Sequence, residues 1–87
     1  MKKINLGQKD IIHFVGIGGI GMSGLAQIMK NMGFRIQGSD QTKNKNTVSC
    51  SKLKIKIYIG HSSNNVKNAT IVVKSSAIKN NNIEIKY

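Results

Sequence analysis

The chain of 87 residues contains no proline, no tryptophan, a single cysteine and only three acidic residues. The lone cysteine, Cys50, excludes an internal disulfide, and with only two histidines a structural zinc site is not expected. No run approaches the roughly 20 apolar residues of a membrane-spanning helix, and the basic start precedes no apolar stretch with a cleavage site. These absences predict one small cytoplasmic domain without a signal peptide or a membrane partner.

The charge is strongly one-sided. Fourteen lysine and arginine residues against three acidic ones give a formal net charge of +11, which is typical of nucleic-acid-binding proteins. Arg35 is the only arginine, however, although arginine makes the paired hydrogen bonds that read bases and phosphates best. The lysines are scattered from Lys2 to Lys86, and the abundant lysine, asparagine and isoleucine share codons rich in A and T. We therefore interpret the charge as a solvated, compositional surface and expect no nucleic-acid partner.

The first half of the chain has a strand, loop and helix pattern. Residues 11–16 are a short apolar run that ends in glycine, as in a parallel strand covered on both faces. Apolar residues then recur at helical spacing: Met22, Leu25, Ala26, Met29 and Met32. The opposite side of this helix is predicted to be polar: Ser23, Gln27, Lys30 and Asn31. Gly33 stands where a left-handed C-cap is expected.

Further elements alternate along the rest of the chain. Residues 34–38 and 55–59 alternate as strands, residues 70–74 are β-branched, and a weakly amphipathic stretch at 48–53 predicts a short helix. Residues 62–68 favour a helical turn, and the tail from 79 to 87 is left unassigned. Alternating strands and helices predict a Rossmann-like α/β half-domain with a mostly parallel sheet of four to five strands flanked by helices. One domain is predicted over residues 1–87.

The glycine-rich segment carries the chemistry. Gly16, Gly18 and Gly21 form a G-x-G-x-x-G motif between a strand and a helix, where such loops bind the phosphates of nucleotides. Gly16 would permit the turn, Gly18 would let the backbone approach a pyrophosphate, and Gly21 would let the helix pack closely on the strand. Asp40 follows the second strand, where a carboxylate can bind a ribose or base. The alternatives are a glycine turn that only packs tightly and, for Asp40, the N-cap of the next helix.

The stretch from His13 to Ala26 closely resembles the glycine loop of the Mur ligase family, and within it of the ligases that join L-alanine to UDP-N-acetylmuramate in peptidoglycan synthesis. The likeness continues in order through residues 38–40, 59–62 and 75–78. The related murein-peptide recycling ligase also opens with a nucleotide-sugar domain, but its glycine loop reads differently. The alanine-adding branch is therefore preferred.

The resemblance implies an N-terminal domain that binds the UDP part of UDP-N-acetylmuramate. Carried over residue by residue, the pyrophosphate would contact Gly18, Gly19, Ile20, Gly21, Met22 and Ser23. The uridine would lie near Ser39 and Asp40. The same crevice would be lined by His61, Ser75, Ser76, Ala77 and Ile78. The location agrees with the sheet pattern, because Asp40, His61 and Ser75 all follow strand ends.

Plainer roles stay open for several of these residues. His61 could be a surface histidine that caps the following turn, and Ser75 with Ser76 could form an ordinary turn between strand and loop. His13, inside the first strand, is expected to be structural. The glycine motif with Asp40 also leaves open a small NAD(P)-binding module.

The family resemblance also shows what the chain does not contain. The family binds ATP and Mg²⁺ on a P-loop of another domain, and no Gly-Lys-Ser/Thr sequence occurs here. The resemblance therefore implies a partial chain that binds UDP-N-acetylmuramate but has no catalytic residue, no metal site and no cofactor of its own. The remaining ligase domains would be its partners. Residues 83–87 depart from the family, which continues there into a helix.

Overall fold

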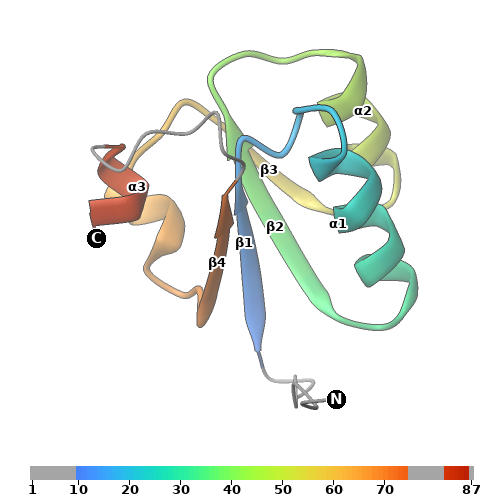
Figure 1. Cartoon of the computed structure of the whole chain (residues 1–87), viewed down its shortest axis with the longest axis horizontal. Helices are drawn as coiled ribbons and strands as arrows, with labels where there is room; N and C mark the ends of the chain where they lie inside the picture. The colour runs from blue at the N-terminus through green and yellow to red at the C-terminus, as the bar shows by residue number, and fades with distance from the viewer. Residues whose placement is uncertain (1–9, 75–81, 87) are drawn as a thin grey trace.

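The computed structural model describes residues 10–74 and 82–86, which form a parallel sheet with helices on both faces (Figure 1). The strands are β1 (Ile11–Val15), β2 (Arg35–Asp40), β3 (Lys56–Ile59) and β4 (Ile71–Lys74). The helices are α1 (Met22–Asn31), α2 (Lys45–Lys52), the 3-10 helix η1 (Ser63–Val66) and α3 (Ile83–Lys86). The predicted α/β class and the parallel sheet are confirmed, with four strands among these residues.

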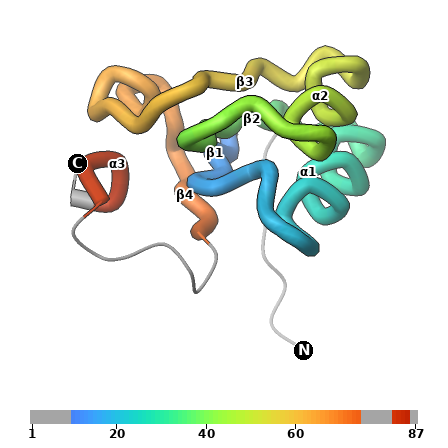
Figure 2. The backbone as a smooth tube through the Cα atoms, turned by 90° about the horizontal axis from the view of Figure 1, so that it is seen from above, coloured from blue at the N-terminus to red at the C-terminus, as the bar shows by residue number. Residues whose placement is uncertain are grey.

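The strand order is β3-β2-β1-β4, and all neighbouring strands run parallel. α1 and α2 lie on one face of the sheet, whereas η1 and α3 lie on the other (Figure 1 and Figure 2). After β3 the chain returns to the far side of β1, so the winding direction reverses between β1 and β4. In open parallel sheets, ligands bind beyond the carboxyl ends of the strands at such a reversal.

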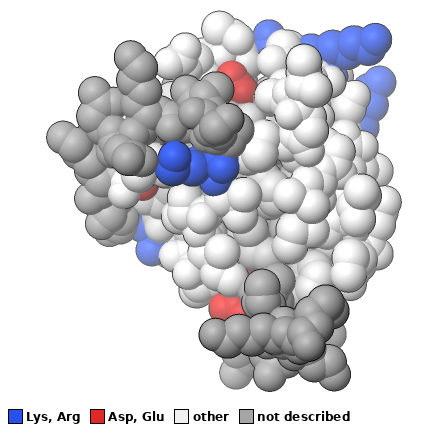
Figure 3. Space-filling model, in the orientation of Figure 1, with Lys and Arg blue, Asp and Glu red and all other residues white. Residues whose placement is uncertain are grey.

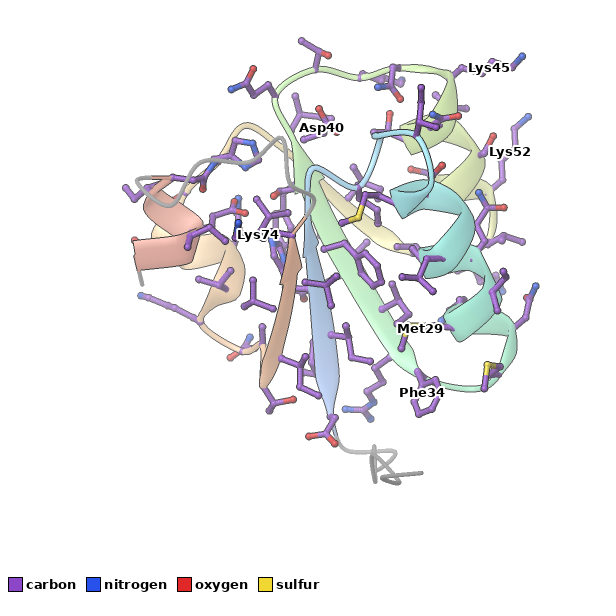
Figure 4. All side chains as sticks on the ribbon, viewed as in Figure 1. Met29, Phe34, Asp40, Lys45, Lys52 and Lys74 are labelled. Carbon is purple, nitrogen blue, oxygen red and sulfur yellow. The ribbon has the colours of Figure 1, made fainter. Side chains whose placement is uncertain are left out.

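The face under α1 and α2 carries the apolar core. Side chains alternate along a strand, and Ile12 and Phe14 of β1 enter this core with 1% and 0% of their surface exposed. The other buried members come from the loop, both helices, β2 and the residue before β3: Ile17, Met22, Ala26, Ile36, Cys50 and Ile55. Met29 and Phe34 pack against this cluster near the end of α1 (Figure 4).

Helix α1 does not bury the side that its sequence predicts. Met22 and Ala26 are buried as expected, but Leu25 and Met32 are 44% and 67% exposed, and Ser23 is buried. The small Ser23 faces α2, where the Cys50 thiol lies 3.9 Å from the Ser23 carbonyl oxygen. Because α1 packs closely against α2 at Ser23, the side of α1 that is buried is not its most apolar side. The prediction for Ser23, Leu25 and Met32 was therefore wrong.

Helix α2 begins earlier than its weak pattern predicts, because Asn44 caps it. Asn44 Oδ1 accepts a hydrogen bond from the Thr47 amide at 2.9 Å, and Thr47 Oγ1 accepts one from the Asn44 amide at 2.8 Å. This reciprocal pair is a capping box. Asn44, rather than Asp40, is therefore the N-cap of the helix that follows β2.

The other face of the sheet is polar at its centre. His13 of β1 and Ser39 of β2 are fully buried on this side, and Gln37 lies beside them. They alternate with the residues that enter the apolar core, as strand geometry requires. Within the tail that the sequence leaves unassigned, residues 83–86 form the helix α3, and its Glu84 is also buried. The predicted departure from a family helix was therefore wrong for residues 83–86.

Basic side chains are dispersed on the surface. On the face shown in Figure 3, the described lysine and arginine side chains sit in separate places around a mostly uncharged surface. Lys45 and Lys52 of α2 point away from the body of the molecule (Figure 4). None of the helices in residues 10–74 and 82–86 has the length and apolar character needed to cross a membrane.

Gly38→Ala is expected to destabilise the chain by about 1–3 kcal/mol or more, as overpacked cores do. A Cβ at Gly38 would lie 2.5 Å from Ile17 Cδ1 and 2.9 Å from the Phe14 carbonyl oxygen. Gly24→Ala on α1 is the matched control, because nothing lies within 4 Å of its added Cβ. That variant should gain about 0.5–1 kcal/mol from alanine's helix preference. Urea denaturation measures both free energies of unfolding, and equal effects would contradict this packing.

Candidate functional site

The glycine loop joins β1 to α1 at the carboxyl edge of the sheet. Gly16 and Gly21 have positive φ angles of 79° and 84°, which favour glycine. Several loop amides donate to carbonyl groups of the loop itself: Gly19, Met22 and Ser23. The amides of Ile20 and Gly21 have no hydrogen-bond partner among the described residues, and both residues are exposed. Open amides at the start of a helix are a suitable arrangement for binding an anion.

Polar side chains hold the loop from the side of α2. The Gly18 amide donates to Asp40 Oδ2 at 2.8 Å, and the Asn46 side-chain amide donates to the Gly18 carbonyl at 2.9 Å. A Cβ on Gly18 would lie 2.8 Å from Asp40 Oδ2 and 2.7 Å from Asn44 Nδ2. Glycine at this position therefore makes room for Asp40, which lies at the end of β2 beside the loop (Figure 4).

Gly21 has a different role from the one its place in the motif predicts. The sequence predicts that a glycine here lets the helix approach the strand, but nothing lies within 4 Å of a Cβ built on Gly21. Its positive φ is what favours glycine. Close packing occurs instead at Gly19, where a Cβ would lie 3.2 Å from the Gly16 carbonyl oxygen.

Ser39 connects the loop to the polar face of the sheet. Its carbonyl oxygen accepts hydrogen bonds from the amides of Gly16 and Ile17, both at 2.9 Å. Its side chain is buried on the opposite face, where the hydroxyl donates to Glu84 Oε1 at 2.5 Å. His61 Nδ1 lies 3.1 Å from the same hydroxyl oxygen. One residue thus contacts both the glycine loop and the histidine.

His61 follows β3 and has a side chain that is 10% exposed. The cap of η1 is the next residue, Ser62, whose hydroxyl accepts a hydrogen bond from the Asn64 amide at 3.3 Å. The alternative in which His61 caps this turn is therefore wrong. Its ring is held by Ser39 and lies 3.4 Å from Glu84 Oε1.

The buried carboxylate of Glu84 has hydrogen-bond donors on both oxygens. Oε1 accepts from the Ser39 hydroxyl and from His13 Nε2, the latter at 2.9 Å. Oε2 accepts from the Ser62 amide at 3.0 Å and from the Asn65 side-chain amide at 2.6 Å. The carboxylate therefore ties α3 to β1, β2 and the segment around η1.

These contacts determine the charges in the cluster. Burial by itself raises the pKa of Glu84, but hydrogen bonds from Ser39, Asn65, His13 and Ser62 outweigh it and lower the pKa from 4.5 to about 2. Burial lowers the pKa of His13 below its ordinary 6.5, and the nearby Glu84 offsets this only in part. We therefore treat the contact between His13 and Glu84 as a hydrogen bond from a neutral imidazole to a carboxylate.

Gln37 determines which nitrogen of His13 carries the proton. Its side-chain NH₂ donates to the Asn65 carbonyl oxygen at 2.7 Å and lies 2.8 Å from His13 Nδ1. The Asn65 carbonyl oxygen can only accept a hydrogen bond, so the NH₂ group of Gln37, and not its side-chain oxygen, must face it. The second proton of this NH₂ group then points to His13 Nδ1. His13 Nδ1 is then the acceptor, and Nε2–H donates to Glu84.

The structure places the predicted site residues in two groups at the carboxyl edge. The loop and Asp40 lie on the side of α1 and α2, whereas the side chains of Ser39 and His61 lie on the side of α3. Ile20 projects fully into solvent, while Met22 and Ser23 are turned into the interior. Four further predicted residues fall outside the described part of the chain: Ser75, Ser76, Ala77 and Ile78.

The sequence did not indicate several polar residues of this region: Gln37, Asn44, Asn46, Asn65 and Glu84. His13 was the one available signal, because a histidine within an apolar, doubly covered strand requires buried polar partners. That signal does not say which residues supply them. Glu84 lies 71 positions away, between two isoleucines of the unassigned tail.

ATP and Mg²⁺ do not fit the residues described. No Gly-Lys-Ser/Thr sequence is present to hold a triphosphate. Across residues 10–74 and 82–86, no three His, Cys, Asp or Glu side chains are grouped so that they could hold a metal ion. We therefore assign no step of ATP or metal chemistry to this chain.

Comparison with known proteins gives relatives along most of the chain. The sequence pattern described as "Mur ligase family, catalytic domain" matches residues 11–87. A UDP-N-acetylmuramate–L-alanine ligase from Pelagibacter ubique is 65% identical over 83 residues, which are 95% of this chain and 18% of that protein. The ligase of the same name from Wolbachia sp. subsp. Brugia malayi is 54% identical over 78 residues, covering 90% and 15%. The chain thus spans less than a fifth of the length of these two relatives.

Solved structures agree with the described fold. A crystal structure of UDP-N-acetylmuramate-alanine ligase from Thermotoga maritima superposes with a TM-score of 0.82 at 40% identity, covering 86% of this chain and 17% of that one. UDP-N-acetylmuramate:L-alanyl-gamma-D-glutamyl-meso-diaminopimelate ligase from Neisseria meningitides gives 0.76 at 29% identity, covering 88% and 24%. Fold and loop define a Rossmann-like α/β domain. The chain belongs to the Mur ligase family.

Glu84→Gln is expected to make folding less sensitive to acid. The folded pKa of Glu84 is about 2 against an ordinary 4.5, so its contribution is complete above about pH 5 and is lost as the pH falls toward 2. At 1.36 kcal/mol per pKa unit, the wild type should lose about 3 kcal/mol more than the variant over this range. Urea denaturation at several pH values measures the difference. Parallel pH curves, or an ordinary carbon-13 titration of the wild-type Glu84 carboxyl, would contradict the network.

Proposed function

We propose that residues 1–87 are the N-terminal UDP-binding domain of a ligase that joins L-alanine to UDP-N-acetylmuramate in peptidoglycan synthesis. The observation that supports this most is the glycine loop at the carboxyl edge, with open amides at the start of α1, in a member of the Mur ligase family. The relatives' names supply the substrate, because both are UDP-N-acetylmuramate–L-alanine ligases.

In this proposal the pyrophosphate binds along residues 18–23. The amides of Ile20 and Gly21 donate to phosphate oxygens, and the positive end of the α1 dipole adds to the attraction. α1 has no acidic residue in its first turn, so its own side chains do not repel the phosphates. The side chains of Met22 and Ser23 are buried and their amides donate to the Gly19 carbonyl, so these two residues shape the start of the helix rather than donate to the phosphates.

The uridine binds beside the ends of β2 and β3. Asp40 keeps the Gly18 amide on Oδ2 and offers Oδ1 to a ribose hydroxyl or a base N–H. Ser39 is fully buried, so its hydroxyl acts on the ligand through His61 and not by direct contact. β4 lies beside β1, the strand that precedes the glycine loop. Residues 75–78 follow β4 in the sequence, and in this proposal they complete the crevice.

Ligation itself belongs to the remaining domains of a full-length ligase, which are the partners of this one. Those domains bind ATP and Mg²⁺, and the present chain contributes by holding and orienting the nucleotide sugar. We place the reaction in the cytoplasm, because that compartment keeps thiols reduced and Cys50 is a buried cysteine outside any disulfide.

Nucleotide titrations test the assignment. UDP should bind the chain with a Kd on the order of 0.1–1 mM, equivalent to about 4–5.5 kcal/mol, and ADP and NAD should bind more weakly. Asp40→Ala should reduce the preference for UDP over ADP, because it removes a ligand for the uridine but leaves the loop amides. Asp10→Ala is the matched control, since it removes the same charge just before β1, on another part of the chain. Calorimetry at low and moderate salt measures these affinities.

Two outcomes of the titrations would refute the proposal. Equal affinity for UDP and ADP that vanishes at moderate salt would indicate a nonspecific cationic surface, since such binding weakens steeply with salt. Tighter binding of NAD than of UDP would favour the small dinucleotide-binding module instead.

The chain alone should not ligate alanine, because it contains no P-loop. Incubation with ATP, Mg²⁺, L-alanine and UDP-N-acetylmuramate is expected to release no ADP above the background of a reaction without alanine. A coupled assay for ADP measures this. Release that depends on both alanine and the nucleotide sugar would show that the assignment as a binding domain is wrong.

A further inference from the structure

The hydrogen bonds around Ser39 have only one consistent direction. Glu84 is a carboxylate near neutral pH and can only accept, and its Oε1 lies 2.5 Å from the Ser39 hydroxyl oxygen. The single hydroxyl proton of Ser39 must lie between these two oxygens, because two bare acceptors at that distance would repel. His61 Nδ1, which is 3.1 Å from the same oxygen, must therefore be the donor of the second bond. A neutral His61 then carries its proton on Nδ1.

The other ring nitrogen of His61 is open. Nε2 has no hydrogen-bond partner among the described residues. No buried side-chain nitrogen or oxygen of that part of the chain lacks a partner, so Nε2 is within reach of solvent. In the Nδ1–H form it presents a lone pair there.

The backbone around His61 is fixed from both sides. The amide of the preceding Gly60 donates a hydrogen bond to the Asp40 carbonyl at 2.7 Å, and the Gly60 carbonyl accepts one from the Asn65 side-chain amide at 3.0 Å. The following Ser62 donates its amide to Glu84 Oε2 at 3.0 Å. Rotation of the ring to exchange the two nitrogens would break its bond with Ser39. The same carboxylate therefore holds both the ring and the segment that carries it.

We propose that Ser39 and Glu84 are positioning residues that hold His61 with its proton on Nδ1, so that Nε2 accepts a hydrogen bond from a donor on the bound nucleotide. This inference rests on the proposed function, in which His61 lines the uridine crevice, and it specifies how the histidine acts. UDP has such donors at the imide N–H of its base and at the ribose hydroxyls. We assign the imide N–H, because Asp40 on the other side of β2 is suited to the ribose hydroxyls.

Nitrogen-15 NMR of the free protein tests the positioning step without any ligand. At about pH 8, where an ordinary histidine is neutral, correlation through the ring carbons identifies the protonated nitrogen. His61 should show a protonated Nδ1 and an unprotonated Nε2. Ser39→Ala removes the acceptor and should give a mixture of both forms, whereas Ile83→Ala, an exposed α3 residue outside the network, should not. A wild-type His61 protonated on Nε2 would overturn the proposal even if the variants fail to fold.

Modified nucleotides test the ligand contact. UDP methylated at the imide nitrogen should bind wild type and Ile83→Ala about tenfold more weakly than UDP, and 2′-deoxy-UDP should bind them with less loss. In Ser39→Ala, where only part of the His61 population carries its proton on Nδ1, the penalty for methylation should be smaller than in wild type. A larger loss with 2′-deoxy-UDP would move the donor to the ribose and overturn the imide assignment. Equal binding of all three nucleotides to wild type would overturn the acceptor role of His61.

The two experiments separate this inference from the proposed function. If UDP does not bind wild type, the proposed function fails and the ligand contact fails with it, whereas the NMR result still decides whether Ser39 and Glu84 set the tautomer. If UDP binds with the expected preference over ADP but tolerates the imide methyl group, only the further inference fails.

Discussion

A single buried carboxylate holds the polar half of this fold together. Glu84 accepts hydrogen bonds from two side chains of the sheet and from two groups near η1. Replacing it with an apolar residue would take the acceptor from the buried His13 and Ser39, at a cost of about 1–3 kcal/mol each. The short α3 could not be stable alone in water, since isolated helices need a dozen or more residues. Its position therefore depends on this carboxylate and on the packing around it.

The scarcity of acidic residues makes their placement informative. Asp10 accepts a hydrogen bond from the Thr70 hydroxyl at 3.0 Å, Asp40 from the Gly18 amide at 2.8 Å, and Glu84 from its four donors. Each joins segments that are far apart in the chain. The basic residues in the described part of the chain, in contrast, are largely at the surface, where water solvates them. Net charge thus says little about this protein, whereas the positions of its three carboxylates say much about its tertiary structure.

The local parts of the structure are predictable from the sequence, and the long-range polar contacts are not. The strand from Ile11, the turn at Gly16 and the placement of Asp40 after β2 follow from short patterns whose physical causes lie within a few residues. The partnership of His13 with Glu84 has no local signature, because it requires α3 to return across 71 positions. The buried side of α1 is also set from outside, by contact between Ser23 and Cys50 of α2.

The adjacent residues Ser39 and Asp40 serve opposite faces of the sheet, and this has an evolutionary consequence. Inserting or deleting one residue in β2 before Ser39 would move the side chains that follow the change to the opposite face of the sheet. The hydroxyl would then meet the glycine loop, and the carboxylate would enter the space beside His13 and Glu84. Length changes can therefore accumulate in the exposed segment 41–43 but not in β2. Descendants of this chain should diverge in the length of that connection while keeping the spacing from Ile36 to Asp40.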